Sequence, residues 1–130
     1  MEFLLNPGIS GQQEITVSSQ DTASKYGSGL IEVFATPAMV ALMEKTAQLS
    51  IQDLLPEGFI SLGTEINVTH QKATPVGMKV VCESVLEKVE GKRLLFSVTA
   101  RDEKGLIGRG THQRYIVEAG RFMQKLMENT

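Results

Sequence analysis

The sequence of 130 residues predicts an α+β fold in which an antiparallel sheet wraps around one long helix. An apolar segment at residues 37–55 has the boundaries of a helix, an alternating segment precedes it, and four extended segments follow it in succession. Strands grouped after a single helix favour an antiparallel sheet. The length is that of one domain, so we expect residues 1–130 to form a single domain with a substantial core.

Residues 14–19 alternate between apolar and polar side chains, which predicts a half-buried strand with Ile15 and Val17 on the inner side. The next segment, residues 21–29 (DTASKYGSG), is rich in turn formers and predicts an irregular connection. Segments of this kind also form lids over binding sites, although an ordinary connection is the more common outcome.

The dipeptide Thr36-Pro37 predicts a helix start, because a threonine side chain can cap free N–H groups and proline is tolerated at the first helical position. Pro56 and Gly58 indicate where this helix ends. Its first two turns are apolar on every side, so we expect the helix to be buried over most of its surface.

The four segments after the helix, residues 62–71, 78–89, 92–102 and 106–117, read as strands joined by turns. In the first of them Ile66, Val68 and His70 share a face, so His70 ends an inward row. The second and third form a hairpin, and one face of the third carries Leu94, Phe96, Val98 and Ala100. Residues 119–127 predict a short final helix.

The composition excludes several classes of protein. The net charge is −2 and the basic residues are scattered, which gives no footprint for nucleic acid or for a membrane surface. No stretch approaches the roughly 20 apolar residues of a membrane span, and MEFLL carries Glu2 where a signal peptide would be basic. Cys82 is the sole cysteine, which fits a reducing cytoplasm.

Two side chains suggest chemistry. Glu44 follows an apolar stretch of a buried helix, where a carboxylate must reach solvent, pair with a neighbour or serve acid–base chemistry. A solvated Glu44 and a hydrogen-bonded structural His70 are the commoner outcomes for each residue alone. An imidazole and a carboxylate that converge on an apolar cavity are, however, the usual ingredients of general acid–base catalysis.

Two glycine-containing motifs add candidate binding residues. Gly63 and Thr64 open the strand that carries His70, and a glycine there would serve either as an oxyanion site or as a bulge. In GRGTHQR, residues 108–114, Arg109 and Arg114 have opposite parity, so at most one faces the cavity. We expect the other to form a cross-strand ion pair rather than to bind phosphate.

The motifs VFATPAMVALME, SLGTEINVTHQKATPVGMKV, VEGKRLLFSVTARD and GTHQR, in this order, resemble the hotdog-fold thioesterases similar to fluoroacetyl-CoA thioesterase. The match covers residues 15–122. The resemblance implies a hotdog fold of about five strands around one helix, hydrolysis of an acyl-CoA thioester without a metal or bound cofactor, and a homodimer or higher oligomer with active sites at the subunit interface.

The resemblance also implies residue roles. Thr36, Glu44 and His70 would be catalytic, and Gly63 and Arg114 would contact the substrate. Glu44 would act as base or nucleophile, His70 would polarise the carbonyl or protonate the departing thiolate, and Thr36 would orient a partner or the water. Direct attack by water and an acyl-enzyme intermediate both stay open.

Helix geometry limits how these residues meet. Thr36 and Glu44 are eight residues apart, so on one straight helix they lie roughly 12 Å apart along the axis and about 80° around it. They cannot touch directly, which predicts a cluster completed across the dimer or bridged by substrate or water.

The substrate class and the competing functions follow from the same motifs. The member of this family specialised for fluoroacetyl-CoA closes its site with aromatic lid residues, whereas this chain has Leu30 and Ile31 before Val33, so we expect a small or medium acyl-CoA. A non-catalytic module that binds acyl-CoA and a hydratase on the same fold are the alternatives, because a fold alone does not prove an activity.

Overall fold

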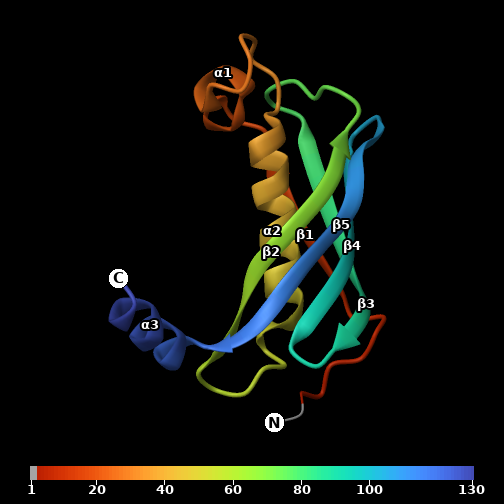
Figure 1. Ribbon diagram of the computed structural model, residues 1–130. Coiled ribbons are helices and arrows are strands. Elements are labelled where there is room, and N and C mark those ends of the chain that lie inside the picture. The colour runs from red at the N-terminus through yellow and green to blue at the C-terminus, as the bar shows by residue number, and fades with distance from the viewer. Residues whose placement is uncertain (1–2) are drawn as a thin grey trace.

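The structure is a computed structural model that describes residues 3–130; Met1 and Glu2, which the single-domain and signal-peptide predictions include, lie outside the described residues. Figure 1 shows the chain with its elements labelled. In chain order these are β1 (Ser10–Thr16), η1 (Ser19–Asp21), α1 (Ala23–Tyr26), α2 (Thr36–Gln52), β2 (Phe59–His70), β3 (Lys79–Glu90), β4 (Arg93–Asp102), β5 (Gly105–Glu118) and α3 (Ala119–Glu128).

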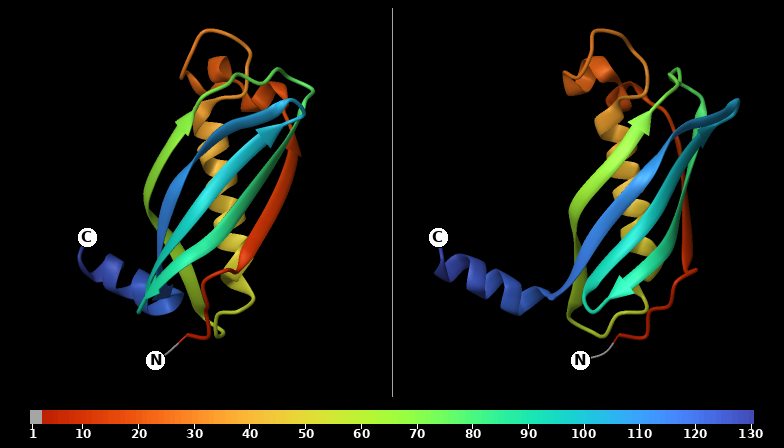
Figure 2. Two further views of the ribbon diagram at one scale, coloured as in Figure 1. Left: turned by 90° about the vertical axis from the view of Figure 1, so that its right-hand side faces the viewer. Right: turned by 45° about the vertical axis from the view of Figure 1, so that its right-hand side comes forward.

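The five strands form one antiparallel sheet in the order β1-β3-β4-β5-β2, so β1 and β2 are its edges. Helix α2 runs along one face of this sheet, and the strands curve around it (Figures 1 and 2). The predicted antiparallel sheet around one long helix is therefore confirmed. None of the helices in residues 3–130 is long and apolar enough to cross a membrane.

Helix α2 begins where Thr36-Pro37 predicts, but for a different reason. The capping residue is Ala35, no side chain caps the helix, and Thr36 is already its first residue. The predicted cap by Thr36 is therefore wrong, because the Thr36 hydroxyl bonds to His70 instead. Proline at the second helical position is still compatible with a helix start, because an N–H in the first turn has no partner within the helix.

One side of α2 supplies much of the core. It packs against the sheet through buried residues spaced by three and four positions: Ala38, Met39, Leu42, Met43, Thr46, Ala47 and Ile51. The opposite side stays exposed at Pro37, Ala41, Lys45 and Leu49. The predicted burial of the first two turns is wrong for Pro37 and Ala41, because the sheet covers one side of the helix only.

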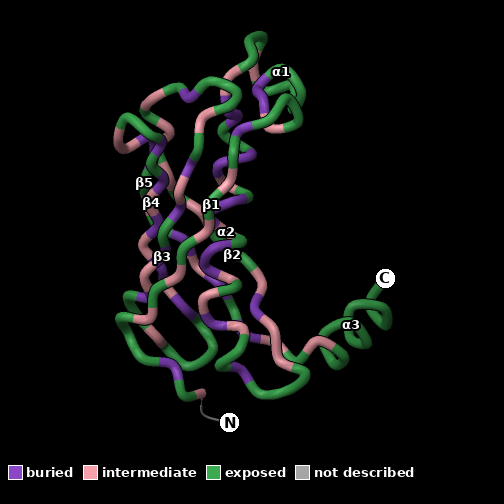
Figure 3. The backbone as a smooth tube through the Cα atoms, turned by 180° about the vertical axis from the view of Figure 1, so that it is seen from behind, coloured by how far each residue is buried: buried purple, intermediate pink, exposed green. Residues whose placement is uncertain are grey.

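The strand predictions are largely confirmed, but the first strand is Ser10–Thr16 rather than residues 14–19, because the chain turns into η1 after Thr16. Buried and exposed residues alternate along the strands (Figure 3), and the inward row of β4 is fully buried at Leu94, Phe96, Val98 and Ala100. In β2, Ile66, Val68 and His70 are half-buried while their neighbours are exposed. This strand begins at Phe59 rather than at Leu62, so Gly63 lies inside it instead of opening it. The predicted final helix forms as α3.

The segment over residues 21–29 is more ordered than predicted. Ser18 caps η1, and the Thr22 hydroxyl caps α1 by accepting a hydrogen bond from the Lys25 N–H at 3.3 Å. Gly27 ends α1 with a φ of 72°, which favours glycine. The chain then returns as Phe34 N donates to the Thr74 carbonyl at 2.8 Å, so this segment is held against the loop that follows β2.

Asp102 fixes the loop that follows His70. Its buried carboxylate accepts hydrogen bonds from the Thr74 hydroxyl at 2.8 Å, the Lys104 N–H at 2.8 Å and the Lys72 ammonium at 3.0 Å. Burial alone would raise the pKa of Asp102, but these hydrogen bonds outweigh burial and bring the pKa below its usual 3.8.

Asp102→Asn should lower the free energy of unfolding by about 2 kcal/mol, because it removes charge-assisted hydrogen bonds from a buried group. A carboxyl with a lowered folded-state pKa stabilises the fold above its unfolded pKa, and this stability is lost as the pH falls. Urea unfolding should therefore show the full difference from wild type above pH 3.8 and a smaller one below it. The exposed Asp53→Asn is the control, and an equal loss there would contradict the role given to Asp102.

Candidate active site

The first half of the candidate site is a hydrogen bond between α2 and the end of β2. The Thr36 hydroxyl lies 2.8 Å from His70 Nδ1, while His70 Nε2 is buried and has no hydrogen-bond partner in residues 3–130. Phe34 packs edge-on against the imidazole, with ring centroids 6.2 Å apart. Burial lowers the pKa of His70, and the Lys72 backbone acts in the opposite direction. The imidazole is therefore neutral at neutral pH.

These residues line a depression of about 280 Å³. Its walls come from the end of β2, the start of α2 and the segment between α1 and α2: Ala23, Ser28, Val33, Phe34, Thr36, His70, Gln71, Lys72 and Ala73. The hydroxyl–imidazole pair thus borders a space that a ligand can enter.

The second half of the site surrounds Gly63 in the middle of β2. A Cβ atom at Gly63 would lie 2.7 Å from Glu44 Oε1, 3.1 Å from His112 Cε1 and 3.5 Å from Arg114 Nη1. The half-buried Glu44 thus reaches β2 from α2. Any side chain at position 63 would collide with this carboxylate unless Glu44 moved, so glycine gives Glu44 the room that it occupies. The β2–β5 register also shifts between Gly63 and Glu65, which is the bulge that the sequence left open.

Arg114 is buried and clamped by β2. Its Nε donates to the Ser61 hydroxyl at 2.7 Å, and its Nη2 donates to the Ser61 carbonyl at 2.8 Å. Its Nη1 lies 3.0 Å from His112 Nε2. Burial lowers the pKa of Arg114, while the negative charge of Glu44 raises it.

The two arginines of GRGTHQR lie on opposite faces of β5, as their odd and even positions along the strand predict. Arg114 is buried near Glu44, while Arg109 is exposed. Arg109 lies opposite Thr69 and Thr99 in the sheet register, and no ion pair involves it in the described part of the chain. The predicted cross-strand ion pair is therefore wrong.

The structure sorts the predicted residues into two groups: Thr36 with His70, and Glu44 with Gly63 and Arg114. Thr36 and Glu44 share no hydrogen bond, as their spacing on the helix predicts. Along β2, Gly63 and His70 are seven residues apart, which is roughly 23 Å of extended chain. In one protomer, therefore, the Glu44 carboxylate reaches the middle of β2, whereas the His70 imidazole lies at the end of this strand.

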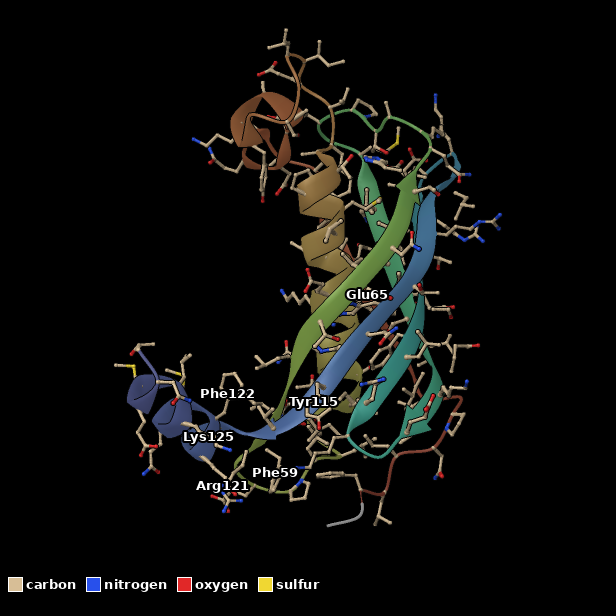
Figure 4. The ribbon with its side chains drawn as sticks, viewed as in Figure 1. Phe59, Glu65, Tyr115, Arg121, Phe122 and Lys125 are labelled. Carbon is tan, nitrogen blue, oxygen red and sulfur yellow. The ribbon has the colours of Figure 1, made fainter. Side chains whose placement is uncertain are left out.

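Sequence analysis did not single out two residues of the second group, His112 and Ser61. His112 is fully buried and has the same parity as Arg114, so strand alternation alone could have placed it beside the arginine. Its Nδ1 lies 2.8 Å from the carbonyl of Glu65, which Figure 4 labels on β2. Ser61 has the parity of Gly63, but nothing in the sequence indicates that it binds Arg114.

A separate groove of about 630 Å³ runs between α3 and the adjoining ends of β2 and β5. Figure 4 labels Phe59, Tyr115, Arg121, Phe122 and Lys125 along it. None of the predicted site residues lines this groove, so it is not the candidate active site. Across residues 3–130, no three His, Cys, Asp or Glu side chains are grouped to hold a metal ion.

Comparison with known proteins gives consistent matches. A family model described as fluoroacetyl-CoA-specific thioesterase matches residues 17–120. A fluoroacetyl-CoA thioesterase from Streptantibioticus cattleyicolor is 43% identical over 99 residues, covering 76% of this chain and 71% of that protein. The structure of a fluoroacetyl-CoA thioesterase mutant in complex with acetyl-CoA has a TM-score of 0.90 at 35% identity, covering 97% of this chain and 99% of the other. A hot-dog-like protein from Thermanaerovibrio acidaminovorans has a TM-score of 0.89 at 27% identity, covering 97% and 93%.

Gly63→Ala should displace the Glu44 carboxylate without unfolding the protein. The new methyl group would collide with the flexible end of Glu44, and the backbone of Gly63 is not left-handed, so alanine is not strained there. We expect a crystal structure of the variant to show Glu44 moved away from β2, and the free energy of unfolding to change by less than about 1 kcal/mol. Gly120→Ala, which meets no neighbouring atom, is the control. An unmoved Glu44 would refute the contact.

Proposed function

Because the chain belongs to the fluoroacetyl-CoA-specific thioesterase family, we propose that it hydrolyses acyl-CoA thioesters to the free acid and CoA. The family match confirms the predicted thioesterase class, and the likeness to the solved hot-dog-like protein confirms the predicted hotdog fold. The observation that carries the proposal is the 2.8 Å hydrogen bond between Thr36 and His70 at the edge of an open depression. It leaves one buried imidazole nitrogen free to act on a ligand.

The geometry supports a division of roles. If the Thr36 hydroxyl donates to His70 Nδ1, the imidazole carries its hydrogen on Nε2, which has no partner in residues 3–130. This N–H would polarise the thioester carbonyl, whereas protonation of the departing thiolate would need His70 in its doubly protonated form. Glu44 would attack the carbonyl carbon or activate a water molecule, and Arg114 and the backbone at Gly63 would contact the acyl group. Direct attack by water and formation of an acyl-enzyme intermediate both agree with this arrangement.

We propose that two copies of the chain complete the site. Strand β2 is an edge of the sheet, and α2 is exposed along Pro37, Ala41, Lys45 and Leu49. A free strand edge and an uncovered helix face favour pairing with a second copy. If two β2 strands pair antiparallel about a point between Ile66 and Asn67, Gly63 lies opposite the partner's His70. Glu44 and the imidazole of the other subunit would then face the same thioester.

The surface beside the depression bears on substrate size. Leu30 is 98% exposed and Ile31 is 64% exposed, so neither of these two side chains closes over Thr36 and His70. An open entrance supports a small or medium acyl group rather than selection for fluoroacetyl-CoA. We further propose that residues 1–130 act as one domain in the cytoplasm, where the buried Cys82 would stay reduced.

Hydrolysis of a panel of acyl-CoAs, followed by thiol release, tests the proposed activity. We expect Glu44→Ala and His70→Ala each to lower kcat by at least about 100-fold, the usual contribution of a general acid or base. The exposed Glu57→Ala should keep the wild-type rate. A module that only binds acyl-CoA would bind the panel without releasing thiol. Equally slow thiol release by the wild type and both variants would disprove thioesterase activity in this chain.

Mixing the two inactive variants tests the shared site. If Glu44 of one subunit works with the partner's His70, a dimer of one Glu44→Ala and one His70→Ala chain contains one intact site. Co-refolding the two variants should then restore at most about a quarter of the wild-type rate, because half of the dimers are mixed and each has one working site. Each variant refolded alone serves as the control. No recovery, with mixed dimers verified by differently tagged chains, would place each site within a single subunit.

A further inference from the structure

We propose that His112 is a positioning residue that keeps the Arg114 guanidinium from pairing with Glu44 and so leaves the carboxylate free to act. The inference rests on the proposed function, because Glu44 is the group whose freedom matters. His112 is fully buried on β5, with Phe96 near its ring at a centroid distance of 6.3 Å. Both of its ring nitrogens have hydrogen-bond partners, Glu65 and Arg114.

The partners of His112 determine which nitrogen carries its hydrogen. The Glu65 carbonyl, 2.8 Å from Nδ1, can only accept a hydrogen bond, so Nδ1 must donate. The Arg114 guanidinium, 3.0 Å from Nε2, can only donate, so Nε2 must accept. His112 is thus a neutral imidazole with its hydrogen on Nδ1. Burial, which lowers the pKa of His112, agrees with this state.

Arg114 and Glu44 are close enough to attract each other. Glu44 Oε1 and Arg114 Nη1 lie 2.7 Å and 3.5 Å from the same point, the position of a Cβ atom at Gly63. No ion pair nevertheless joins the two side chains in the described part of the chain. A half-buried carboxylate at this range from a buried guanidinium would otherwise form a hydrogen-bonded pair with it.

Three acceptors hold the guanidinium away from the carboxylate. Ser61 binds Nε and Nη2 through its hydroxyl and its carbonyl, and His112 Nε2 binds Nη1. Because the guanidinium is planar, these contacts fix its orientation. His112 alone restrains Nη1, which is the nitrogen found near Gly63. Without this acceptor Nη1 would have no partner among the described residues, and a tilt of the whole guanidinium about its Ser61 contacts would bring Nη1 to the Glu44 carboxylate.

The test compares two substitutions of His112 in the chain of 130 residues. His112→Leu removes the acceptor, so Arg114 should pair with Glu44 and kcat should fall about 10- to 100-fold, the usual cost of losing an orienting partner. His112→Gln keeps an acceptor for Arg114 and a donor for Glu65, so most of the lost kcat should return. Ile107→Val, on the same strand and fully buried, is the control for core packing. A crystal structure of His112→Leu should show Arg114 Nη1 bonded to the Glu44 carboxylate.

Nitrogen-15 NMR of the wild-type protein supplies a readout independent of activity. We expect the His112 ring to show a protonated Nδ1 and an unprotonated Nε2 across neutral pH. A hydrogen on Nε2, a wild-type kcat in His112→Leu, or a folded His112→Gln as slow as His112→Leu would overturn the inference. If instead Glu44→Ala hydrolyses acyl-CoA at the wild-type rate, the role given to Glu44 fails while the thioesterase activity stands. Equally slow thiol release by the wild type and all variants would mean that the proposed function fails, and the NMR result would still decide the tautomer.

Discussion

The packing of α2 against the sheet is the constraint on which the site depends. Met39, Met43 and Ile51 are completely buried, which fixes the rotation of the helix about its axis. Thr36 and Glu44 then lie at the border of the buried face, on the side of β2. The same packing that stabilises the core therefore delivers a hydroxyl to one end of β2 and a carboxylate to its middle.

Local sequence patterns predicted most of the fold and the orientation of the site residues. Strand alternation placed His70 inward and separated Arg114 from Arg109, because the side-chain period of a strand does not depend on distant contacts. The capping role of Thr36 was wrong because a tertiary partner, His70, takes its hydroxyl. Short helices before α2 and the buried Asp102 anchor were missed, since both depend on contacts between segments far apart in the chain.

The site residues around Gly63 also show that local sequence patterns do not reveal contacts between distant segments. Motif order and resemblance identified Glu44, Gly63 and Arg114, yet the reason for the glycine emerges only when the carboxylate is seen against the strand. The neighbouring His112 explains how a buried arginine and a carboxylate stay close without forming an ion pair. Such an arrangement keeps the Glu44 carboxylate and a positive charge in one place, which would suit the proposed hydrolysis, since the carbonyl oxygen of a thioester becomes negative during the reaction.

The central claim is that the carboxylate of one subunit and the hydroxyl–imidazole pair of another act on a single thioester. A crystal structure of the protein with a non-hydrolysable acyl-CoA thioether would test it most directly. Our account predicts a dimer in which the thioether lies between Glu44 and the partner's His70. A ligand bound beside Thr36 and His70, with Glu44 of both copies remote from it, would contradict the account.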